Sequence, residues 1–111
     1  MGLMPKPFNV DVVSPEATVW SGAATFVVAR TTEGEIGIMA DHEPVMAALA
    51  TGAVKIESES ETVTIGVHGG FLQILNNQVT LLTDRAELAE GDADDARKLA
   101  EGLRELEEGA E

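Results

Sequence analysis

The chain changes its residue chemistry once, near residue 85. Before that point Val, Ile, Thr and Gly dominate, whereas the remainder is rich in Ala, Leu, Glu, Asp and Arg. β-Branched residues favour strands, while Ala, Leu, Glu and Arg lose little entropy in a helix. The sequence therefore predicts an N-terminal β domain over residues 1–86 and a C-terminal helical element over residues 87–111.

Within the β zone, apolar residues alternate with polar ones at a period of two, as in half-buried strands. Turn-forming residues separate these runs at Ser14-Pro15, Ser21-Gly22, Thr32-Glu33-Gly34, Ser58 to Glu61 and Asn76-Asn77. The Asn pair tolerates positive φ and suits a tight hairpin. Many short strands with frequent turns indicate an antiparallel sandwich or barrel. We predict a mainly β fold, in which an antiparallel β-sandwich is followed by a single short C-terminal α-helix.

The predicted helix begins after Asp92, a favourable N-cap residue, and Gly109 is suited to end it. Three- and four-residue spacing gives it one narrow apolar stripe, made of Ala96, Leu99, Ala100, Leu103 and Leu106. An isolated helix of about 16 residues is marginally stable in water. Because the sequence predicts no second helix, we expect the stripe to rest on the sandwich or on a partner.

Charge and composition exclude several classes of protein. The 111 residues include 20 acidic and 7 basic side chains, for a net charge of −13, and no cysteine. Disulfide scaffolds, thiol nucleophiles and Cys-ligated metals are excluded, and the negative field disfavours nucleic acid and anionic lipid. The segment from Thr62 to Thr83 has no charged residue, but it alternates and contains Asn and Gln. It predicts strands, so we expect no direct membrane insertion.

Sequence motifs for catalysis are scarce. Neither a G-x-S-x-G elbow nor a phosphate-binding loop is present. The densest polar cluster comprises Glu33, Glu35, Asp41, His42 and Glu43. A metal site there would need more histidines than His42 and the distant His68. Small and apolar residues beside the charges favour a contact loop for a partner over a solvated loop, an acid–base pair or a metal site. We predict no catalytic residue, metal or cofactor.

Several motifs, taken together and in order, resemble the epsilon subunit of F-type ATP synthase. The E-G-E-I-G-I run at Glu33–Ile38, followed four residues later by His42, is the most specific part. The other matching segments are Val10 to Pro15, Trp20-Ser21-Gly22, Pro44, His68 to Leu72 and Asn77 to Glu87. The resemblance covers about residues 8–100, and Trp20 with Arg30-Thr31-Thr32 is most similar to actinobacterial members.

This resemblance implies a non-catalytic rotor subunit of the central stalk, which couples proton-driven rotation of the membrane c-ring to the gamma subunit and ATP synthesis. It implies a peripheral location at the cytoplasmic face of the cell membrane. The C-terminal helix is a possible contact with the catalytic alpha and beta subunits. The residues implied to contact the c-ring are Glu33, Glu35, Ile38, Met39, Asp41 and His42.

The sequence departs from the family pattern at two places. Ala40-Asp41 stands where the family has Pro-Gly before the histidine, so we expect an altered loop conformation. Only one C-terminal helix is predicted, whereas self-inhibiting members use two, so strong inhibition is not expected. Asp94 and Arg97 are a remnant of the family's nucleotide motif, without its Ile/Leu and Ala.

Two other hypotheses follow from the residues alone. A free-standing acidic β-sandwich that binds a protein or a small ligand predicts a concave apolar pocket. A small hydrolase would use Glu33, Glu35 or His42.

Overall fold

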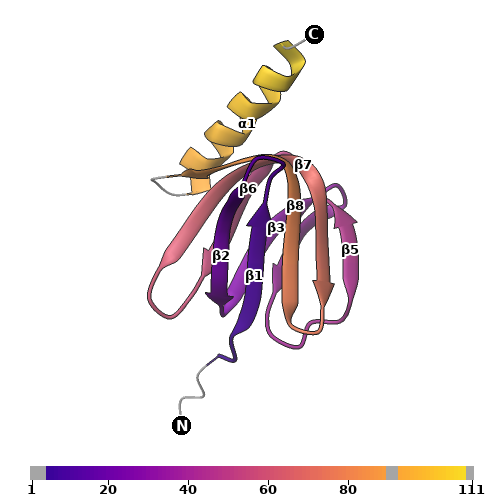
Figure 1. The fold of residues 1–111 in the computed structure, drawn as a ribbon, viewed down its shortest axis with the longest axis vertical. Helices are drawn as coiled ribbons and strands as arrows, with labels where there is room; N and C mark the ends of the chain where they lie inside the picture. The colour runs from indigo at the N-terminus through magenta and orange to yellow at the C-terminus, as the bar shows by residue number, and fades with distance from the viewer. Residues whose placement is uncertain (1–4, 90–92, 110–111) are drawn as a thin grey trace.

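The computed structural model describes residues 5–89 and 93–109, with the side chains of the helix described over 96–105. These residues form eight strands and one helix, which confirms the mainly β fold with a C-terminal helix (Figure 1). The elements are β1 Phe8–Val13, β2 Thr18–Ala24, β3 Phe26–Thr31, β4 Gly34–Ile38, β5 Val45–Ala48, β6 Gly52–Glu57, β7 Thr62–Leu75, β8 Gln78–Ala89 and α1 Ala93–Gly109.

The strands pair in the order β2-β1-β8-β7-β6-β3-β4, and β5 pairs with β7 outside this series. Every pair is antiparallel except β1 with β8, which is parallel. Hairpins require antiparallel neighbours, but β1 and β8 come from opposite ends of the β region and no hairpin joins them. The predicted antiparallel sandwich therefore contains one parallel pair.

A long ribbon made of β7 and β8 belongs to both layers of the fold. The first half of β7, Thr62–Val67, pairs with β6, while Phe71–Ile74 pairs with β5. β8 pairs with β7 from Thr64 to Leu75, on both sides of this change of partner. The change of partner falls at Gly69 and Gly70, whose φ angles are 75° and 111°. A Cβ at Gly70 would lie 2.0 Å from the Leu82 carbonyl oxygen, so only glycine fits this crossing.

Alternate side chains from both layers fill the core. The largest fully buried ones are Ile38, Ile56, Ile65, Leu72, Ile74, Leu81, Val10, Val12, Val27, Val54, Val67 and Val79. The alternating residues of Phe8–Val12 and Val63–Val67 place their apolar side chains inward, although Val63 is only half-buried. Thr83 is a buried polar residue whose hydroxyl donates to the Val13 carbonyl at 2.9 Å.

The helix α1 rests on the sandwich at the end opposite the start of β1, and its distal part projects beyond the strands (Figure 1). Its small residues Ala96 and Ala100 are fully buried. They lie over Gly66 of β7, where an added Cβ would come within 2.5 Å of the Ala96 carbonyl oxygen. The predicted apolar stripe thus packs on the sandwich. Asp92 and the side chain of Leu106 lie outside the described part. No helix within the described ranges is both long and apolar enough to cross a membrane.

The predicted turns have mixed outcomes. Asn76 and Asn77, with φ of 50° and 62°, form the β7–β8 hairpin, and the Ser58 amide bonds to the Glu61 carbonyl at 2.9 Å. The turn predicted at Ser21-Gly22 is wrong, because both residues lie inside β2. Glycine suits position 22 because the Trp20 ring lies over it. A Cβ added at Gly22 would come within 3.0 Å of this ring.

Candidate functional site

Two of the predicted contact residues, Glu33 and Glu35, belong to the β3–β4 hairpin. The Thr31 hydroxyl shapes the turn by donating to the Gly34 carbonyl at 2.7 Å and accepting from the Glu33 amide at 3.2 Å. Glu33 is exposed on this turn, and Glu35 is exposed on β4 opposite Arg30. The polar run predicted as one loop is therefore partly a strand.

Three further residues of the set, Met39, Asp41 and His42, lie beyond the far end of β4. Met39 is 63% exposed, and Asp41 is exposed, while His42 is half-buried. His42 Nδ1 donates to the Glu43 carbonyl at 2.8 Å, which orients the imidazole. An extended strand separates Glu35 from Ile38 by roughly 10 Å along the chain. The structure therefore divides the predicted contact residues into a hairpin group and a loop group.

Ile38 is a correction to the predicted contact set. Its side chain is fully buried, with 0% exposure, and it belongs to the hydrophobic core. The alternation along β4 points it inward, so it supports the loop from below and offers no surface to a partner.

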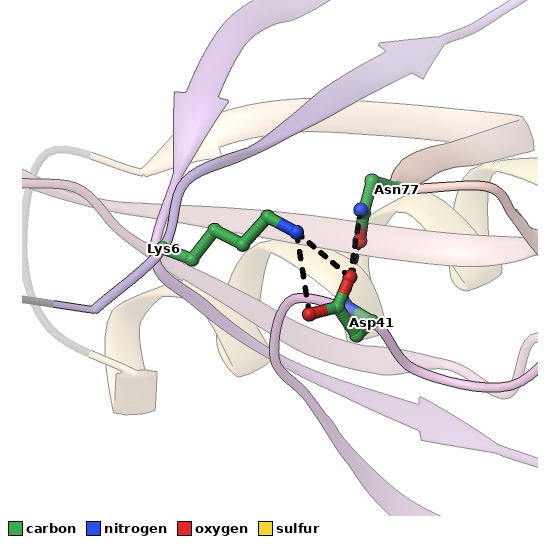
Figure 2. A network of polar contacts seen from close by, with 3 residues as sticks. All are labelled: Lys6, Asp41 and Asn77. Carbon is green, nitrogen blue, oxygen red and sulfur yellow. Dashed lines mark hydrogen bonds and ion pairs between the residues drawn. The ribbon is translucent and has the colours of Figure 1, made fainter.

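The loop 39–44 is fastened by a network between three distant segments (Figure 2). The Asp41 amide donates to Asn77 Oδ1 at 2.6 Å, and Asn77 Nδ2 donates to Asp41 Oδ1 at 3.0 Å. Lys6 Nζ reaches the same carboxylate at 3.0 Å and 3.3 Å. The hydrogen bonds from Asn77 and Lys6, with the attraction of the ammonium group, lower the pKa of Asp41 below its ordinary value.

Asp41 also explains how the loop tolerates a residue other than glycine. Its φ is 65°, in the left-handed region that glycine adopts most easily and that Asp and Asn tolerate. The backbone of Asp41 thus adopts a conformation that a glycine would also favour. The expectation that losing Gly alters the backbone finds no support in this φ angle.

Arg97, part of the predicted nucleotide-motif remnant, lines a groove of about 520 Å³ between α1 and the strands. The remaining lining includes Arg30, Glu35, Lys55 and Glu101. The side chain of Asp94 lies outside the described part. Two carboxylates offset most of the charge of the three cations in this lining, so it is not strongly positive, as a triphosphate would require.

The described residues do not assemble a catalytic or metal centre from the predicted candidates. Glu33 and Glu35 lie on the hairpin, while His42 lies beyond the other end of β4. His68 is half-buried, with Nδ1 at 2.7 Å from the Thr51 hydroxyl. Among the described ranges no three His, Asp or Glu side chains are grouped to hold a metal ion.

A surface that the sequence reasoning missed lies on the outer side of β5, β7 and β8. We call it the outer apolar face; it consists of Met46, Phe71, Leu75 and Leu82, which are 70%, 56%, 45% and 52% exposed. Phe71 is the cross-strand partner of Leu82 and of Ala48, so these side chains share one side of the sheet. The signal was present, because Leu72 and Ile74 alternate with the apolar Phe71 and Leu75 in one strand.

Comparisons with known proteins agree on one family. Residues 7–89 match the family model for the ATP synthase delta/epsilon chain, β-sandwich domain. The chain is 48% identical over 88 residues to an ATP synthase epsilon chain of Streptomyces avermitilis, covering 78% of this chain and 71% of the relative. It is 45% identical over 103 residues to the epsilon chain of Rhodococcus opacus, covering 89% and 84%. Both relatives are actinobacterial, as Trp20 and the Arg30 segment implied.

Solved structures show the same fold. A chain in the cryo-EM structure of Euglena gracilis mitochondrial ATP synthase, OSCP/F1/c-ring, aligns with a TM-score of 0.72 and 27% identity, covering 94% of this chain. A chain in the Tetrahymena thermophila central stalk/c-ring structure aligns with a TM-score of 0.61, 15% identity and 70% coverage. This chain spans 66% and 63% of those two chains. The chain therefore belongs to the family of ATP synthase epsilon chains, which are a non-catalytic subunit of ATP synthase.

Proposed function

We propose that this chain binds both the gamma subunit and the membrane c-ring and connects them mechanically, at the cytoplasmic face of the membrane. Its task is to transmit rotation driven by protons, and no bond is made or broken in it. The outer apolar face is the observation that carries the proposal. An exposed apolar surface continuous over several strands is typical of a protein interface and is costly to leave in water.

The outer apolar face suits the gamma subunit. Its residues come from adjacent, hydrogen-bonded strands, so the surface is rigid before a partner arrives. Pro44, Met46, Gln73 and Leu75 line a shallow apolar groove of about 240 Å³ at its edge. A largely uncharged surface also avoids the like-charge repulsion that a chain of net charge −13 meets with acidic partners.

The c-ring contact is proposed at the loop group, through Met39, Asp41 and His42. Met39 offers an exposed apolar side chain, and Asp41 and His42 offer groups that pair with basic or polar residues on the ring. Glu33 and Glu35 lie on the separate hairpin and form a second, peripheral part of this proposed contact. The projecting part of α1 is the proposed contact with the catalytic alpha and beta subunits.

A binding experiment tests the gamma contact. The double variant Phe71→Ser with Leu82→Ser removes the centre of the outer apolar face, and truncation of central apolar anchors weakens interfaces by roughly tenfold or more. Affinity for purified gamma is measured by calorimetry, with circular dichroism confirming that both variants stay folded. The matched control is Leu88→Ser, because Leu88 is 46% exposed and lies in the other half of β8.

The expected result is a large loss of gamma affinity for the double variant and none for Leu88→Ser. Equal affinity for all three proteins would remove the proposed face. If the unaltered chain binds neither gamma nor the c-ring but captures a small ligand, the acidic binding module becomes the better hypothesis.

A further inference from the structure

Asn77 joins three segments that lie far apart in the sequence. Its backbone carbonyl accepts from the Asn9 amide at 3.0 Å, where β1 begins. Its side chain makes two hydrogen bonds to Asp41, one to the amide and one to the carboxylate. Lys6, which precedes β1, reaches the same carboxylate. The hairpin turn of β7 and β8 is thus tied both to the start of the sheet and to the loop 39–44.

The two bonds of Asn77 define the geometry of Asp41 from both sides. One fixes the amide nitrogen of Asp41, and the other fixes its carboxylate, so neither the backbone nor the side chain can rotate independently. Asp41 holds a φ of 65°, which costs a non-glycine residue energy unless its surroundings favour it. The Asn77 side chain supplies that compensation, because its oxygen and nitrogen face a matching donor and acceptor.

Lys6 has a different part in the network. Its ion pair with Asp41 is exposed, at 61% for Lys6 and 65% for Asp41. Exposed pairs contribute little and are screened by salt. Lys6 therefore helps to orient the Asp41 carboxylate. The neutral amide of Asn77 fixes the conformation of the loop, and salt does not weaken its hydrogen bonds.

We propose that Asn77, assisted by Lys6, is a positioning residue that holds the loop 39–44 in the conformation that meets the c-ring. The inference rests on the proposed function of the loop, and it adds a residue from another turn that acts through its hydrogen bonds to Asp41. A preformed loop loses less conformational freedom on association than a loop that has to be ordered. Asn77 therefore raises affinity for the ring by pre-organisation.

The chain offers a matched pair of variants for the test. Asn77→Gly removes the side chain and keeps a residue suited to the φ of 62°. Asn76→Gly makes the same change at the neighbouring turn position, whose φ is 50°. A third variant, Asp41→Asn, keeps the donor–acceptor match with Asn77 but removes the charge that Lys6 contacts. All three are prepared in the 111-residue chain.

Hydrogen exchange gives the first measurement, and it needs no partner. The Asp41 amide is expected to exchange roughly five- to tenfold faster in Asn77→Gly, because this variant removes the oxygen to which the amide donates. The increase should be the same in low and in high salt. Asn76→Gly and Asp41→Asn are expected to exchange at the original rate. Unchanged protection of the Asp41 amide in Asn77→Gly would overturn the inference.

Binding to purified c-ring is the second measurement. Asn77→Gly is expected to bind about fivefold or more weakly, with Asn76→Gly unchanged and gamma affinity unaffected. If the unaltered chain does not bind the c-ring, the proposed loop contact fails, whereas the exchange result still decides whether Asn77 fixes the loop. Faster exchange with unchanged ring affinity would overturn the positioning role while leaving the loop contact intact.

Discussion

The backbone of α1 lies directly on Gly66: a Cβ at this glycine would come within 2.5 Å of the Ala96 carbonyl oxygen and 2.9 Å of the Ala100 nitrogen. The obstructing atoms belong to the helix backbone, so a side-chain rotation cannot relieve the clash. The absence of a side chain on β7 is therefore what allows the helix to approach the sheet closely enough to bury Ala96 and Ala100.

Gly66→Ala is expected to push α1 away from the sandwich. We expect a loss of about 1–3 kcal/mol in the free energy of unfolding, as for other substitutions that overpack a core. Urea denaturation followed by circular dichroism measures it. Because helix docking is the part affected, amides of α1 should lose protection from hydrogen exchange more than those of β1. Full stability of Gly66→Ala would contradict the close approach.

Gly102→Ala is expected to act in the opposite direction. Gly102 lies within α1, and among the described atoms none lies within 4 Å of an added Cβ, apart from its chain neighbours and the nearby backbone of α1 itself. Alanine in a helix interior is favoured over glycine by about 0.5–1 kcal/mol. The midpoint of thermal unfolding should therefore rise. A fall would mean that this face of α1 has a neighbour in the isolated protein.

Thr83→Val tests the buried hydroxyl that links β8 to β1. The Thr83 hydroxyl donates to the Val13 carbonyl at 2.9 Å, and Thr83 is only 4% exposed. Valine has nearly the same shape but cannot donate, so the variant should unfold about 1 kcal/mol more easily. Thr80→Val, on the outward side of the same strand, serves as the control. Similar stability losses in both would point to strand propensity instead of the hydroxyl.

The pKa of the Asp41 carboxyl should respond to both of its partners. Hydrogen bonds from Asn77, then from Lys6, lower this pKa in the folded chain. Asn77→Gly and Lys6→Ala should each raise it toward the ordinary value of about 3.9, because each removes a group that lowers it. Titration of the carboxyl carbon by NMR measures both shifts. No change in Asn77→Gly would contradict the network.

The same shift fixes the pH at which the network stabilises the fold. A carboxyl with a lowered folded pKa favours folding above its unfolded pKa, and that contribution is lost as the pH falls through the folded value. The difference in stability between the original chain and Asn77→Gly should therefore shrink below about pH 4. A difference that grows in acid would reverse this sign.

The hairpin at Asn76-Asn77 could be predicted because its turn chemistry is local. Strand β5 could not, because Val45–Ala48 is short and lacks alternation, and it depends on pairing with the second half of β7. The inward position of Ile38 also needed the structure, since the apolar Met39 follows it directly and the sequence alone does not show which of the two faces the core. The Lys6–Asp41–Asn77 network joins residues more than 30 positions apart, so no local sequence pattern could predict it.

The shared ribbon of β7 and β8 has a mechanical consequence. Since β7 pairs with β6 in one layer and with β5 in the other, and β8 runs beside it through both, a torque applied to one layer passes into the other along continuous covalent backbone. The two sheets cannot slip past one another without breaking the ribbon itself. The β domain is therefore expected to rotate as a rigid unit, with little torsional deformation between its two layers.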